Sequence, residues 1–162
     1  MCNLCFMIKD ILELPEIKNL PSKRFEYGSF VGKVLYLGWY LLIFYRSGDN
    51  KISALSFDDI DSQPQLRDLA NTILNKLDIP IQVGDSASSI VSRLGNPVNK
   101  DSILESITRM YFLKDDSLLC IGVHDKHGVV SFEVIYDKDI IKERIMSFLK
   151  LKRECRHIHR VD

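Results

Sequence analysis

The sequence predicts an α+β fold in which an antiparallel sheet of hairpins packs against helices. One long segment near residue 70 has apolar residues at helical spacing. Elsewhere, short runs rich in aromatic and β-branched residues alternate with turn sequences, which is typical of hairpins. The 162 residues, 46% of them hydrophobic, suffice for a single domain over 1–162.

The first elements are predicted to be a helix and a series of strands. The helix covers residues 3–14, and Pro15 ends it. Its apolar stripe consists of Leu4, Ile8, Ile11 and Leu12. A polar loop at 21–24 precedes strands at 25–31, 34–37, 39–45 and 51–57. The turn RSGDN, residues 46–50, joins the last two strands as a hairpin.

Two helices are predicted next. In the first, Ser62 can cap, Pro64 suits the first turn, and Ile79–Pro80 ends the helix. Its apolar face consists of Leu66, Leu69, Ala70, Ile73, Leu74 and Leu77. The second lies in GDSASSIVSRLGNP, residues 84–97, where Asp85 or Ser86 caps the start and Gly95 ends the helix before Pro97. It is therefore expected to be short, with fixed ends.

The C-terminal part is predicted to hold three strands and a last helix. The strands cover 107–113, 118–123 and 129–136, with turns at 115–116 and 125–128. The helix covers about 138–152 and is expected to bury Ile141, Ile145, Phe148 and Leu149. Similar hairpins at 40–57 and 117–134 suggest two αβ halves, 1–61 and 62–152, sharing a core. Residues 153–162 are expected to form a loose basic tail.

The charge pattern argues against nucleic acid and membranes as partners. Lys plus Arg and Asp plus Glu number 22 each, so the molecule as a whole attracts neither nucleic acid nor an anionic membrane. The most apolar run, residues 34–45, falls short of the roughly 20 residues that span a bilayer. The N-terminus lacks the basic start of a secretory signal. A soluble, cytoplasmic protein with reduced cysteines is expected.

Candidate metal sites have weak spacing. Cys2 and Cys5 could combine with Cys155, His157 and His159 around zinc, but the first pair falls on a predicted helix. His124 and His127 flank a hairpin turn without a further ligand. No nucleophile elbow, phosphate loop or HExxH motif occurs. No cofactor and no catalytic residue are therefore assigned, and a non-enzymatic protein is expected.

Two charged segments leave alternatives open. Asp58, Asp59 and Asp61 could hold magnesium or serve in acid–base chemistry, although such clusters more often precede a helix. The basic segment 150–162 could bind phosphates, but it has no aromatic residue to stack on bases. A small metal-dependent enzyme and a nucleic-acid-binding or regulatory module thus remain alternative interpretations.

Residues 79–136 resemble the superfamily of small outer-membrane lipoproteins and β-lactamase inhibitor proteins (SmpA/OmlA-like and BLIP-like). The resemblance is carried by Gly84, Ser86, Val91, Leu94, Gly95, Pro97 and Tyr111. It implies two helices laid on an antiparallel sheet, and a protein-binding role through the open face of that sheet. The chain has neither a lipobox nor the paired cysteines of the secreted inhibitors.

The resemblance, together with the lack of a signal, implies a bacterial immunity protein. Such a protein would occlude the active site of a basic, nuclease-type toxin of a contact-dependent growth inhibition system, in a 1:1 complex. The expected contacts are the acids Asp58, Asp59, Asp61, Asp115 and Asp116, with Tyr40, Tyr45 and Tyr111 as exposed aromatic anchors.

Overall fold

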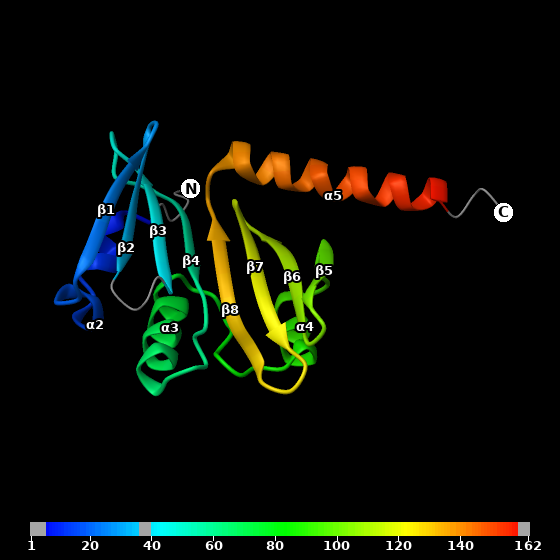
Figure 1. Ribbon diagram of the computed structural model, residues 1–162, viewed down its shortest axis with the longest axis horizontal. Helices are drawn as coiled ribbons and strands as arrows, with labels where there is room; N and C mark the ends of the chain where they lie inside the picture. Colours follow the sequence, from blue (N-terminus) through cyan, green and yellow to red (C-terminus); the bar gives the residue numbers. More distant parts are fainter. Residues whose placement is uncertain (1–5, 36–39, 159–162) are drawn as a thin grey trace.

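The fold is α+β, as predicted, and is built on one antiparallel sheet of eight strands (Figure 1). The computed structural model describes residues 6–35 and 40–158. The strand order is β1-β2-β3-β4-β8-β7-β6-β5, so two four-stranded meanders meet edge to edge where β4 pairs with β8. Each meander follows two helices in the chain, and α5 comes after the second meander.

The first half differs from the prediction at its start. Its elements are α1 (Ile8–Leu12), α2 (Pro15–Lys18), β1 (Ser22–Tyr27), β2 (Phe30–Leu35), β3 (Leu41–Arg46) and β4 (Ile52–Phe57). Pro15 was expected to end a helix but begins α2, because proline fits the first helical turn. The strand expected at 25–31 is a hairpin, which turns at Gly28 with φ of 60°. The strand start predicted at 34 is wrong, since this residue lies near the end of β2. Residues 36–39, which include the start predicted at 39, lie outside the described residues.

The second half holds α3 (Pro64–Lys76), α4 (Ala87–Leu94), β5 (Asn99–Leu104), β6 (Ile107–Lys114), β7 (Ser117–His124) and β8 (Gly128–Ile135). In α4 the prediction is confirmed: Ser86 Oγ accepts from the Ser89 amide, and Gly95 ends the helix at φ of 82°. Gln63, not Ser62, is the residue before α3, because the Ser62 hydroxyl donates to the Asp59 carbonyl.

Two features of the C-terminal part were not predicted. Strand β5 lies where no strand was predicted, yet it pairs with β6 along its length as an edge strand. Helix α5 (Lys138–Ile158) continues past Lys152, so part of the expected loose tail is helical. In Figure 1 this helix crosses the ends of β8 to β5 and extends beyond the sheet.

The two faces of the sheet carry separate cores. Helices α1 to α4 pack on one face, where residues such as Ile11, Ile73 and Ile90 contact the inward side chains of the strands. On the opposite face, which we call the open face, α5 covers only a smaller cluster. That cluster contains Tyr111, Leu118, Cys120, Ile135 and Phe148. None of the helices that the structure describes combines the length and apolar content of a membrane-spanning segment.

Candidate functional site

The open face carries a band of charged residues beside the cluster that α5 covers. Alternation along the strands places Asp101, Arg109 and Glu133 on this face, together with Tyr111 and Cys120 of the cluster under α5. Asp58 follows β4 by one residue and continues its open-face positions Ala54 and Ser56. We call Asp58, Asp101, Arg109 and Glu133 the polar band.

Asp101 and Arg109 are paired within the polar band. Arg109 Nε donates to Asp101 Oδ1 at 3.0 Å and Nη2 donates to Oδ2 at 3.4 Å. Tyr111 Oη donates to the same Oδ2 at 3.0 Å. The hydrogen bond to Asp101 is the main reason why the pKa of Arg109 is raised. This end of the band is therefore already neutralised internally.

Glu133 and Asp58 form the less neutralised end of the band. Burial raises the pKa of Glu133, and Asp58 adds to that effect, while Arg144 of α5 and Arg109 oppose it. The Arg144 guanidinium lies 3.8 Å from the Glu133 carboxylate, a loose contact. Burial also raises the pKa of Asp58, with a further contribution from Asp59. Within the described residues, Asp58 therefore has no ion pair, and the ion pair of Glu133 is this single long contact with Arg144.

An apolar patch adjoins this acidic end on the first half of the open face. It consists of Phe25, Leu42 and Phe44, all half-exposed, and none of the three belongs to either core. The rings of Phe25 and Phe44 meet edge to face with centroids 5.9 Å apart. Gly32 makes room for this arrangement, since a Cβ there would lie 2.0 Å from Phe25 Cζ. These residues were not predicted as a site from the sequence, although β3 has apolar side chains on both of its faces, which was a signal.

The prediction that three tyrosines are exposed aromatic anchors is wrong, because their side chains are buried or half-buried. Tyr45 is 6% exposed and lies in the core under the helices, and Tyr111 is 2% exposed and lies under α5. Tyr40 is half-buried against the helix-side core. The Tyr40 carbonyl accepts from the Asp58 amide at 2.8 Å, so this tyrosine borders the polar band without offering a fully exposed ring.

The five expected acids are not brought together. Asp58 belongs to the polar band, whereas Asp59 has φ of 50° and Asp61 is half-buried in the same connection to α3. Asp115 and Asp116 form the exposed β6–β7 turn at the other end of the strands. Following the register from Asp58 through Ala54, Ile135 and Leu118 to Asp116 gives a separation of roughly 20 Å along the strands.

Cysteine and histidine chemistry is weakly represented in the described residues. Burial, followed by the charge of Glu133, raises the pKa of the Cys120 thiol to about 12, so it stays protonated and a poor nucleophile near neutral pH. His124 Nδ1 accepts from the amides of Lys126 and His127, which organises the β7–β8 turn. Among the side chains that the structure describes, no group of three metal ligands occurs. The predicted zinc ligands Cys2, Cys5, Cys155, His157 and His159 all lie outside these described side chains.

Comparison with known proteins adds little to this geometry. No protein-family model matches the chain, and no curated protein matches its sequence. A solved structure of an extracellular protein containing an SCP domain, from Bacillus anthracis str. Ames, is similar with a TM-score of 0.45 at 10% sequence identity. The match covers 89% of this chain and 50% of that one.

Proposed function

We propose that the protein is a non-catalytic inhibitor that binds another protein through the uncovered part of its open face. In its specific form, the proposal is a cytoplasmic immunity protein that occludes the active site of a basic, nuclease-type toxin of contact-dependent growth inhibition, in a 1:1 complex. The observation that carries the proposal is the apolar patch of Phe25, Leu42 and Phe44 beside the acids Asp58 and Glu133.

The apolar patch supports a protein partner. Stable interfaces are centred on aromatic and aliphatic anchors that become fully desolvated, with polar residues around them. Phe25 and Phe44 supply two aromatic rings that are already held against each other, so little side-chain freedom remains to be lost on binding. The patch lies on strands rather than on loops, which favours a rigid surface.

The polar band supports a basic partner. Asp58 and Glu133 both have a raised pKa, mainly because they are partly buried. A neighbouring acid raises each pKa further: Asp59 acts on Asp58, and Asp58 acts on Glu133. A Lys or Arg side chain from a partner would relieve this repulsion and would accelerate association by electrostatic attraction. The same contact mimics the phosphates that a nuclease active site binds.

The experiment is reconstitution with the toxin-like protein encoded beside this gene. The two proteins are co-expressed, and the mass of the complex is measured by light scattering after gel filtration. Nuclease activity is then titrated with the wild-type chain and with Phe44→Ala and Asp58→Asn. We expect a 1:1 complex, stoichiometric inhibition, and an affinity that is lowered at least about tenfold by each substitution.

The matched control substitutions lie outside the proposed surface. Leu104→Ala removes an exposed apolar side chain from β5, and Asp68→Asn removes an exposed acid from α3. Both are expected to inhibit like the wild type. A neighbouring product that forms no complex contradicts the proposal. So does binding of an oligonucleotide that is lost on changing Lys150 and Arg153 to Gln, which would establish a nucleic-acid-binding module instead.

A further inference from the structure

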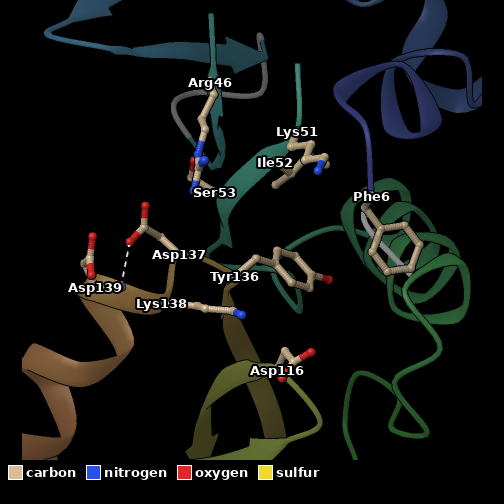
Figure 2. Close-up of a pocket in the computed structure, with 10 residues that line it drawn as sticks. All are labelled: Phe6, Arg46, Lys51, Ile52, Ser53, Asp116, Tyr136, Asp137, Lys138 and Asp139. Carbon is tan, nitrogen blue, oxygen red and sulfur yellow. Dashed lines mark hydrogen bonds between the residues drawn. The ribbon is translucent and has the colours of Figure 1, made fainter. Parts of the chain in front are cut away.

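A pocket of about 490 Å³ lies at the opposite end of the sheet from the polar band (Figure 2). Five segments form it: Phe6 before α1, the end of β3, the start of β4, the β6–β7 turn and the junction of β8 with α5. Its volume falls in the range of about 300–1,000 Å³ that is usual for small-molecule sites. None of its lining residues belongs to the proposed protein-binding surface.

Ser53 on the pocket wall has a hydroxyl without a partner. The side chain is 4% exposed, and its Oγ makes no hydrogen bond. Ser53 is the extra residue of a β-bulge, because Ala54 pairs with Phe44 while Ile52 pairs with Tyr45. Bulges redirect side chains and recur beside binding sites. A buried hydroxyl without a partner is destabilising, and a ligand group that bonds to it would recover this cost.

Six charged residues line the same pocket, in equal numbers of each sign. Three are basic and three are acidic: Arg46, Lys51, Lys138, Asp116, Asp137 and Asp139. No ion pair involves any of the six within the described residues. Asp137 is buried, and its Oδ1 accepts from the amides of Asp139 and Ile140 at the start of α5.

The charges are partly separated across the pocket. In Figure 2, Asp137 and Asp139 lie on one side of the pocket, below Arg46, while Lys138 extends toward Tyr136 on the side where Asp116 lies. A ligand of a single charge would be attracted by three of the six residues and repelled by the other three. A ligand with opposite charges at its two ends can satisfy both groups.

An apolar wall completes the pocket. The rings of Phe6 and Tyr136 lie with centroids 5.9 Å apart, and Ile52 is 4% exposed between the adjoining segments. Such a wall can accept an uncharged aliphatic or aromatic group of a ligand.

We infer that this pocket binds a small zwitterion of the α-amino acid class, free or as a short peptide. Its ammonium group lies toward Asp137 and Asp139, with Ser53 Oγ as a further acceptor. Its carboxylate lies toward Lys51 and Lys138, and its apolar side group lies against Phe6 and Tyr136.

Calorimetric titration of the full chain tests the ligand class. The probes are leucine, phenylalanine and the dipeptide leucyl-leucine, each compared with its N-acetyl and its amide derivative, and with inorganic phosphate. We expect saturable 1:1 binding of a zwitterion, with an affinity at least about tenfold higher than that of either derivative. The free amino acids and the dipeptide distinguish the two sources of this chemistry.

Two variants locate the site. Ser53→Ala and Lys138→Gln are each expected to weaken binding about tenfold, whereas the matched controls Ser92→Ala and Lys142→Gln bind like the wild type. Ser53→Ala removes a buried hydroxyl without a partner, so it is not expected to lower the melting temperature. The inference is overturned if no zwitterion binds up to millimolar concentration, if phosphate or a derivative binds as well, or if both pocket variants retain full affinity.

Discussion

Asp101 and Arg109 lie directly opposite each other on β5 and β6 and form a two-point ion pair, which Tyr111 Oη extends by donating to the same carboxylate. One acid thereby ties an edge strand to the aromatic residue under α5. Replacement by Asp101→Asn keeps the shape but removes the charge. Since both side chains of the ion pair are about 40% exposed, we expect a loss of about 1 kcal/mol of unfolding free energy in urea titrations.

The control for this substitution is Asp68→Asn, an exposed acid of α3 without an ion pair in the described residues. It should change the unfolding free energy by less than about 0.5 kcal/mol. Equal effects of the two substitutions would show that the strand pairing does not depend on the Asp101 charge.

Gly32 is predicted to be required for the apolar patch. In Gly32→Ala, the new methyl group would meet the Phe25 ring, which must move away and lose its contact with Phe44. We expect a loss of about 1–2 kcal/mol of stability in thermal melts and weaker binding of the protein partner. Gly48→Ala is the matched control, because nothing lies within 4 Å of a Cβ at that position. If Gly32→Ala melts like Gly48→Ala, the described packing of Phe25 is wrong.

Glu133 is predicted to make stability depend on pH. Burial raises its pKa in the folded state above that of the unfolded chain, so the folded protein holds this proton more readily. The resulting stability is fully present below the unfolded pKa of about 4.3 and is lost as pH rises through the folded pKa. Glu133→Gln should therefore be more favourable to stability at pH 7 than at pH 4, measured by urea titration against the wild type.

A second variant separates this effect from a general loss of packing. Arg144 lowers the pKa of Glu133, opposing burial, so Arg144→Gln should enlarge the fall in stability between pH 4 and pH 7. Asp58 and Arg109 also face Glu133 and are unchanged in both variants. Parallel pH profiles of wild type, Glu133→Gln and Arg144→Gln would argue against titration of this carboxyl group.

Phe148 is predicted to attach α5 to the sheet. Its ring centroid lies 4.7 Å from that of Tyr111, and the side chain is 9% exposed. Phe148→Ala should cost about 3 kcal/mol of unfolding free energy and increase amide exchange along α5. Met146→Ala on the same helix, 60% exposed, should leave both measurements nearly unchanged. Similar values for the two variants would mean that α5 does not pack through Phe148.

Local signals in the sequence were sufficient where a structure is made by neighbouring residues. The ends of α4 follow from Ser86 and Gly95, whose side-chain oxygen and positive φ act within one helical turn. The hairpin turns at residues 46–50, 115–116 and 125–128 follow in the same way. The periodicity of α3 also predicts its buried face, because one continuous core covers it.

Features that depend on distant partners were missed. Strand β5 is polar and mostly exposed, so only its pairing with β6 marks it as a strand. Leu149 has the spacing of a buried residue but is 51% exposed, which shows that this side of α5 has no cover from the sheet. Tyr111 was expected to be an exposed anchor of the candidate site, but α5 covers it, and a sequence pattern on β6 cannot show which helix lies above a strand.

The joining of β4 to β8 has a consequence for synthesis of the chain. Phe57 pairs with Phe132, about 75 residues later, so the ribosome releases the first four strands long before their neighbour exists. During that interval the backbone groups along one side of β4 have no strand partner, and Leu55 and Phe57 lack their final neighbours. Exposed strand edges of this kind recruit other chains, so the nascent protein is most prone to aggregate, and most dependent on chaperones, between those two points of translation.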